Sequence, residues 1–132
     1  MADSAAGLEN PILNSPYDPP AKHFVFSPTG PTGEMKDGRR PSQSFIPVPI
    51  NKKSKGTQEK LDLFESTHER VEANTLINDI RRQVELWRAR GFPNVTPVSR
   101  KLLQHWADDT REERMLFCQR EAAETAIYLA EV

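Results

Sequence analysis

The chain has 132 residues, a formal net charge of −1 and one cysteine. Its length allows one small domain, its near-neutral charge indicates no class of partner, and a lone cysteine excludes an internal disulfide framework. No apolar run is long enough to span a bilayer, and the first residues lack the basic and apolar regions of a signal peptide. We therefore expect a cytoplasmic protein that has no membrane partner.

Residues 1–58 are predicted to form a proline-rich leader that is extended or disordered in isolation. Nine of the eleven prolines lie in the first 50 residues, and proline resists both helices and central strands. Short β segments are expected within this leader. His23–Phe26 is a candidate strand, Ser27–Pro41 is dense in turn residues, and Phe45–Ile50 alternates apolar residues with prolines, as in an edge strand or polyproline II.

Residues 59–132 are predicted to be helical. After a short apolar cluster at Leu61, Leu63 and Phe64, the first helix is expected over residues 73–90. Its core-facing stripe spans about 100° of the helical wheel and contains Ala73, Leu76, Ile77, Ile80, Val84 and Trp87. Gly91 is a natural helix stop, and Pro93 forbids continuation.

The second helix is expected over residues 97–106, because Thr96 is a good N-cap and Pro97 suits the first helical position. Its inward residues are predicted to be Leu102, Leu103 and Trp106. The third helix is expected over residues 110–132, with a cap at Asp108, Asp109 or Thr110. The predicted fold class is therefore mainly α, with about three helices after the extended leader.

The third predicted helix has an unusually wide apolar face, about half of the helical wheel. This face contains Met115, Leu116, Cys118, Ala122, Ala123, Ala126, Ile127, Leu129 and Ala130. The opposite half holds Glu113, Arg120, Glu121, Glu124 and Glu131, with Phe117 and Tyr128 as aromatic exceptions. The rest of the chain offers too little apolar surface to cover such a face, and Val132 lacks termination signals. These features predict a piece of a larger protein, truncated before its catalytic motifs.

Known catalytic and metal-binding motifs are missing from the sequence. His23, His68 and His105 do not lie at ligand spacing from one another or from Cys118, which is predicted to be a small buried hydrophobic residue. A phosphate-cradling loop of the form Gly-x-x-x-x-Gly-Lys-Ser/Thr does not occur. We therefore expect no complete catalytic site, no metal and no cofactor in this chain.

A local basic segment is compatible with contact to the phosphates of duplex DNA. It contains Arg81, Arg82, Arg88, Arg90, Arg100 and Lys101 against one acid, Glu85. The linker between the first two helices is longer than in a helix-turn-helix motif, so antiparallel helix packing is the favoured interpretation. Trp87 and Trp106 could stack on bases, but their apolar stripes favour core packing.

Gln119 lies near the centre of the wide apolar face. A buried amide is costly unless both of its ends find partners. One interpretation is that this amide reads the edge of a purine. The alternative is a hydrogen bond to a neighbouring backbone group.

The helix sequence REERMLFCQREAAETAIYLAEV, Arg111–Val132, resembles the segment upstream of the ATP-binding loop in superfamily-two helicase-like enzymes. Three earlier stretches, LENPILNSPYDPPAKHFVF, GRRPSQSFIPVP and LINDIRRQVELWRARGFPNVTPVSRKLLQHW, are similar to the leader of type III restriction Res subunits among DEAD/DEAH-box proteins. The resemblance implies that Gln119 contacts adenine with Phe117 nearby. It also implies ATP and Mg²⁺ for the intact parent, whose RecA-like lobes act on DNA.

Two functions follow from these observations. The first is a non-catalytic N-terminal fragment of an ATP-dependent helicase or Res subunit, whose partners are the missing RecA-like lobes or a restriction/modification subunit. The second is a stand-alone small helical module that binds duplex DNA or another protein. The Walker A loop and the acidic box of the parent family are not present in this sequence, so ATP hydrolysis is not expected of this chain alone.

Overall fold

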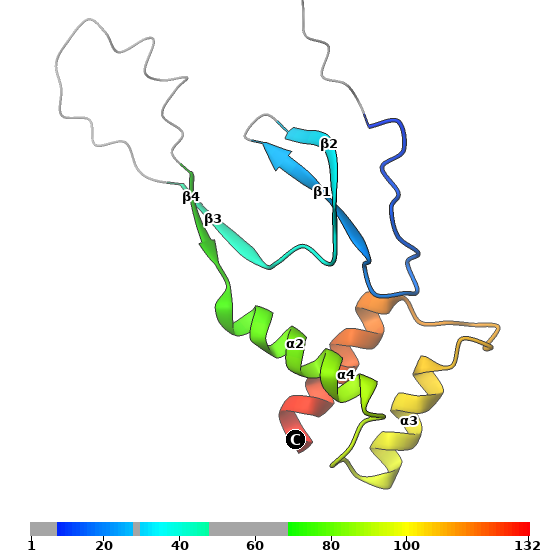
Figure 1. The fold of residues 1–132 in the computed structure, drawn as a ribbon. Coiled ribbons are helices and arrows are strands. Elements are labelled where there is room, and N and C mark those ends of the chain that lie inside the picture. The colour runs from blue at the N-terminus through cyan, green and yellow to red at the C-terminus, as the bar shows by residue number, and fades with distance from the viewer. Residues whose placement is uncertain (1–7, 28–29, 48–68) are drawn as a thin grey trace, which may run out of the picture. The chain divides into compact units, whose positions relative to one another are not determined.

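The computed structural model describes residues 8–27, 30–47 and 69–132, and these residues form a mixed α/β fold (Figure 1). Four strands pair into two antiparallel two-stranded sheets, and three helices follow in the described part of the chain. The prediction of a mainly α fold is therefore wrong, because both sheets draw strands from the proline-rich leader. The cluster at Leu61, Leu63 and Phe64 lies outside the described residues.

The chain divides into two compact units. One unit combines the residues up to Arg40 with Asp79–Val132, and the other contains Pro41–Asn78. The first unit holds one sheet and most of the helical residues.

The sheet of the first unit pairs β1 (Lys22–Ser27) with β2 (Gly30–Asp37). The first strand contains the predicted HFVF segment, whereas the second lies in the stretch that was expected to form turns. The register shifts between Phe24 and Phe26, and Gly33 opposite this shift has a φ of +81°. A glycine with positive φ is typical of a β-bulge, which explains how a segment rich in turn residues still forms a strand.

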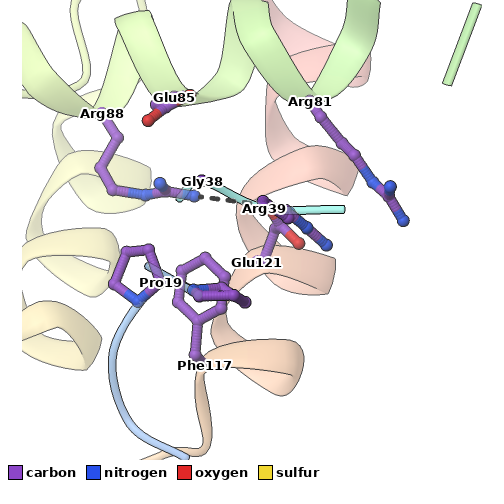
Figure 2. A pocket seen from close by; sticks show the side chains of 9 residues that line it. Pro19, Gly38, Arg39, Arg81, Glu85, Arg88, Phe117 and Glu121 are labelled. Carbon is purple, nitrogen blue, oxygen red and sulfur yellow. Dashed lines mark hydrogen bonds and ion pairs between the residues drawn. The ribbon is translucent and has the colours of Figure 1, made fainter. Parts of the chain in front are cut away.

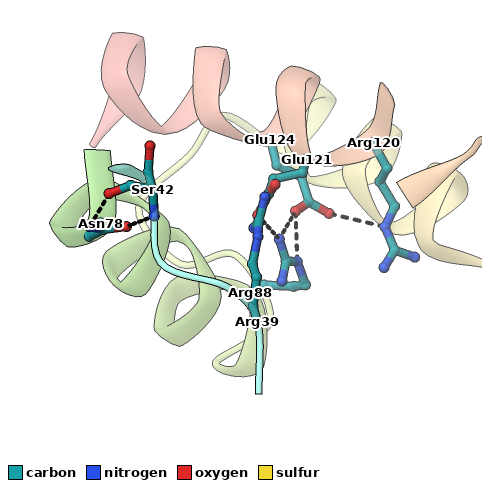
Figure 3. A network of polar contacts seen from close by, with 7 residues as sticks. All are labelled: Arg39, Ser42, Asn78, Arg88, Arg120, Glu121 and Glu124. Atoms are coloured by element: carbon teal, nitrogen blue, oxygen red, sulfur yellow. Dashed lines mark hydrogen bonds and ion pairs between the residues drawn. The ribbon is translucent and has the colours of Figure 1, made fainter. Parts of the chain in front are cut away.

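The second unit contains the other sheet, formed by β3 (Gln43–Pro47) and β4 (Glu69–Ala73). The predicted edge strand over Phe45–Ile50 is confirmed for its described part, because β3 pairs with a single neighbour. Phe45 lies opposite Val71, and both side chains are exposed. Ser42 and Asn78 hold the end of this unit together, since the Ser42 amide donates to the Asn78 side chain at 2.7 Å (Figure 3).

Helix α2 (Thr75–Ala89) ends where the sequence predicted. Gly91 has a φ of +78°. Its amide donates to the carbonyl of Arg88 at 3.0 Å, and the Phe92 amide donates to the carbonyl of Trp87 at 3.1 Å. These two bonds form a Schellman motif, and the ring contact between Trp87 and Phe92 at 4.9 Å is the hydrophobic contact that accompanies it.

Helix α3 (Pro97–Ala107) begins with the predicted cap. The Thr96 hydroxyl accepts a hydrogen bond from the Ser99 amide at 3.3 Å, and proline follows the cap. A second cap comes from a distant residue, because the Glu131 carboxylate accepts from the Thr96 amide at 2.9 Å. The start of α3 is therefore tied to the end of the chain's last helix.

Helix α4 (Phe117–Glu131) begins seven residues later than the predicted start at residue 110. The residues that were expected to cap it make a local turn instead. The Asp108 carboxylate accepts from the amide and the hydroxyl of Thr110 at 2.9 and 2.6 Å. These bonds lower the pKa of Asp108. Aspartate side chains compete in this way with helix formation, which explains the late start.

The core of the first unit lies among the three helices. Val84, Trp87, Phe92 and Leu103 are buried, and half-buried side chains of α4 and the second tryptophan, Trp106, pack around them. The prediction that both tryptophans belong to the core is therefore confirmed. Three other residues were predicted to face inward, and for these the prediction is wrong. The exposed fraction of the residue is 71% for Leu76, 45% for Ile77 and 42% for Leu102.

Candidate functional site

Helix α4 packs through the face that was predicted to be polar. Glu124 is fully buried, Glu121 and Arg120 are half-buried, and Phe117 is buried at the start of the helix. In contrast, Cys118, Ala122, Ala126 and Leu129 are exposed. Most of the wide apolar face is thus not covered by the described residues, in line with the prediction that this chain alone cannot cover it, whereas the prediction that Cys118 is a buried hydrophobic residue is wrong.

Two aromatic residues explain this orientation. Phe117 and Tyr128 stand at the two ends of the glutamate-bearing face, eleven residues or about three turns apart. The Tyr128 ring lies 5.4 Å from the Trp87 ring in an edge contact. Since aromatic side chains bury the largest apolar areas, these two anchors outweigh a row of alanines. Because Phe117 and Tyr128 pack inward, the two glutamates between them, Glu121 and Glu124, also face α2.

The buried glutamates are matched by arginines from three segments (Figure 3). Glu124 accepts from the Nε of Arg88 at 2.6 Å, and its other oxygen lies 3.5 Å from the Nε of Arg120. Glu121 lies 2.6 Å from Arg39, which follows β2, and 3.9 Å from Arg88. Each carboxylate therefore has two guanidinium neighbours, the arrangement that makes charge burial tolerable.

Two guanidinium groups also flank the Phe117 ring. The Arg88 guanidinium carbon is 5.2 Å from the ring centroid, and that of Arg120 is 5.4 Å away. Both distances lie within the range of cation–π attraction. Burial raises the pKa of Glu124 above its usual value, although Arg88 and Arg120 oppose the shift.

A pocket of about 360 Å³ opens beside this cluster (Figure 2). Four segments of the first unit line it: the residues before β1, the residues after β2, and facing turns of α2 and of α4. Its lining combines charged and apolar groups: Pro19, Pro20, Gly38, Arg39, Arg81, Glu85, Arg88, Phe117 and Glu121. It is a candidate binding site formed by described residues.

The two residues predicted to contact adenine, Gln119 and Phe117, differ in their exposure to solvent. Gln119 is exposed, and its Oε1 accepts a hydrogen bond from the Leu116 amide at 3.1 Å. This bond is the backbone interaction that the sequence offered as the alternative, and it caps the start of α4. Phe117 is buried and lines the pocket.

The six basic residues predicted to contact DNA do not form one group of free cations. Arg88 is held by the two glutamates, and Arg82 pairs with Asp79 at 2.9 Å. Arg81 lines the pocket without an ion pair to any described residue. The others, Arg90, Arg100 and Lys101, are exposed near the end of α2 and on α3.

The described residues contain no group of three or more histidine, cysteine or acidic side chains that could hold a metal ion. His68 lies outside the described residues. None of the helices in the described part of the chain has the length and the hydropathy to cross a bilayer.

No protein-family model, no curated protein and no solved structure matches the chain. The resemblance to Res subunits therefore stays a prediction that rests on the sequence alone.

Arg39, Glu121 and Glu124 are members of the site that the sequence did not predict. A signal for them exists in the residues already singled out. The two aromatic exceptions on the acidic half, Phe117 and Tyr128, share a face with both glutamates, and an aromatic pair at that spacing indicates a buried stripe.

Proposed function

We propose that this chain is a non-catalytic module that docks on a larger protein through the outer face of α4, formed by Cys118, Ala122, Ala126 and Leu129. On the resemblance described above, the partner is the first RecA-like lobe of a helicase-like Res protein, whose intact form acts on DNA with ATP hydrolysis. One observation carries the proposal: 63% of Leu129 is exposed on a face that otherwise holds small residues.

Small residues support docking because they let a partner element approach the helix backbone closely. The face is available for this purpose because the first unit uses the opposite side of α4 for its own packing. The side chains with which α4 packs against the core cluster are Ile127 and Tyr128, and Phe117 is buried at the start of the helix. A partner can therefore cover the outer face without displacing the core of the module.

The adenine contact belongs to the same proposal and has a structural requirement. A glutamine that reads adenine uses both its carbonyl oxygen and its amide nitrogen. The Oε1 of Gln119 already accepts from the Leu116 amide, so adenine must use the second lone pair of this oxygen, replace this bond or use the amide nitrogen alone. A Gln119→Ala variant of the docked complex is expected to bind ATP more weakly, whereas docking itself is retained.

Cys118 provides a direct test of docking, because this lone thiol is exposed on the proposed face. A maleimide dye is expected to label Cys118 rapidly in the free protein. Addition of the first RecA-like lobe of a Res protein encoded at the same locus is expected to slow the labelling. Equal labelling rates with and without the lobe would contradict the proposal.

A matched pair of variants separates docking from folding. Leu129→Lys places a charge on the outer face and is expected to abolish protection of Cys118. Leu102→Lys places the same charge on α3, where 42% of the leucine is exposed, and is expected to leave protection unchanged. Both variants should melt like the parent, since surface substitutions usually change stability by about 0.5 kcal/mol or less.

DNA binding is a second candidate because Arg90, Arg100 and Lys101 are exposed and have no ion pair with described residues. If this function holds, the protein retards duplex DNA in a gel shift at low salt, and added salt weakens the binding. Replacing these three residues with glutamine is then expected to remove the shift. Replacing Arg88 is not a suitable test, because that residue holds α2 against α4.

A further inference from the structure

The pocket beside the buried ion pairs is lined by one arginine, Arg81, that has no ion pair with any described residue. Arg39, Arg81 and Arg88 line it, together with the carboxylates of Glu85 and Glu121. Glu121 is engaged by Arg39 at 2.6 Å and by Arg88 at 3.9 Å. Arg88 also pairs with Glu124. The positive charges of Arg39 and Arg88 are therefore compensated by glutamates of the protein itself.

Arg81 differs from its two neighbours in the pocket. It is half-buried and makes no ion pair with any described residue. In the view of Figure 2, Arg81 and Arg88 extend from α2 on either side of Arg39. A guanidinium has five donors and stays charged at any physiological pH. Its partial burial reduces hydration, so an anion from outside gains more from Arg81 than from a fully exposed arginine.

The remaining walls indicate the shape of a ligand. Phe117 is buried at the pocket, and Pro19 and Pro20 contribute apolar surface. These groups have no charge to offer a ligand, but they favour a flat apolar body. The nearby Glu85 reduces the gain from each negative charge of a ligand, because like charges repel.

We propose that this pocket binds a single anionic oxygen group, a carboxylate or a phosphate carried on a small apolar body, with Arg81 as the residue that recognises it. The site goes beyond the docking of α4 and does not depend on it, since α4 faces the pocket with Phe117 and Glu121 and not with its outer face. Carboxylate and phosphate share the planar or forked oxygens that a guanidinium binds in a bidentate way.

The test is an NMR titration of the full-length, ¹⁵N-labelled chain with sodium benzoate and, separately, sodium phenyl phosphate. Ionic strength is kept constant with sodium chloride, because salt screens exposed charges. Saturable shifts of the Arg81 Nε–H signal and of amides around Phe117 are expected for at least one probe. Saturation by phenyl phosphate alone identifies a phosphoryl ligand, and saturation by benzoate alone identifies a carboxylate.

Three variants make the assignment specific. Arg81→Gln is expected to weaken binding about tenfold, the loss of one hydrogen bond to a charged group. Arg82→Gln is the matched control, because this adjacent arginine pairs with Asp79 outside the pocket, and it should leave affinity unchanged. Glu85→Gln is expected to tighten binding about twofold, since it removes a surface charge that opposes the anion.

Arg81→Gln is expected to lower the affinity for the anion, and Glu85→Gln is expected to raise it. Misfolding would lower the affinity in both variants, so it cannot explain this pair of results. Neither residue has an ion pair with described residues, so both variants should melt like the parent. Shifts that grow linearly with both probes, or equal losses for the Arg81 and Arg82 variants, overturn the site. Neither result bears on protection of Cys118, so this site and the docking proposal fail independently.

Discussion

Two regions of the contact between α2 and α4 are stabilised by different kinds of interaction. Near the end of α4, Tyr128 meets Trp87 ring to ring, and apolar burial holds the helices together. In the middle of α4, Glu124 meets Arg88 at 2.6 Å, and opposite charges hold them. An apolar contact tolerates small shifts, whereas a carboxylate between two guanidinium groups fixes one register. We infer that the aromatic end supplies stability and the charged middle supplies orientation.

The largest expected effect comes from the aromatic end. Trp87→Ala should lower the free energy of unfolding by about 4 kcal/mol, the typical cost of truncating a buried aromatic residue. Because this loss is close to the whole stability of a small domain, Trp87→Phe is the milder companion. It keeps a ring but removes the 2.8 Å hydrogen bond from the indole to the Pro93 carbonyl, which is worth about 1 kcal/mol. Urea denaturation followed by circular dichroism measures both losses.

The charged middle is tested by a double-mutant cycle. Glu124→Leu alone should cost about 3 kcal/mol, because it leaves the guanidinium of Arg88 buried without its partner. The double variant Arg88→Met with Glu124→Leu should recover most of this loss, since a hydrocarbon pair can replace a buried ion pair. Chemical denaturation of the four proteins gives the coupling. Losses that simply add would show that the pair does not act as a unit.

A smaller effect is expected at the end of α2, where the backbone sets the position of the aromatic ring. Gly91→Ala should cost about 1 kcal/mol, because Gly91 has a φ of +78° and alanine is strained in that conformation. No atom lies within 4 Å of the added Cβ, so the cost comes from the backbone alone. Gly91→Asn is the control and should cost less, as asparagine tolerates positive φ. Thermal melting compares the two variants.

The smallest effect concerns pH and the contact between α4 and α3. Hydrogen bonds from Ser99 and Thr96 lower the pKa of Glu131 below its usual value of 4.5. The unfolded chain therefore binds a proton more readily at this residue than the folded chain does. The stabilisation is complete above pH 4.5 and is lost as the pH falls through the lowered pKa of the folded state.

Glu131→Gln is the variant that isolates this contribution. It should be less stable than the parent above pH 4.5, and the difference should shrink in acid. Glu124, whose raised pKa acts in the opposite sense, is present in both proteins and cancels from the comparison. Parallel denaturation curves across this pH range provide the measurement. A difference that stays constant with pH would contradict the role of the Glu131 carboxylate.

The candidate site shows how far residue types alone can lead. From the sequence, Arg81 and Arg88 were predicted as site residues because they are basic, and Phe117 because it is aromatic. Three of the residues that line the pocket were therefore identified before the structure was known. The pocket that these residues share was not predicted. It also requires Gly38 and Arg39, which precede Arg81 by about 40 residues in the sequence. Contacts at such separation depend on chain topology, which periodicity within one helix does not encode.

Local signals in the sequence determined the ends of two helices. Thr96 with Pro97, and Gly91 before Pro93, act through hydrogen bonds and backbone angles within a few residues, so these ends need no distant partner. Tertiary structure alone decided which face of α4 turns inward. The helical wheel placed the alanines on a wide apolar face, which was expected to be covered by a partner, and it did not predict that the acidic face packs against this chain's own helices. In the folded chain, two aromatic residues and the arginines of other segments make the opposite face the better one to bury, because matched charges reduce the penalty that isolated glutamates would impose.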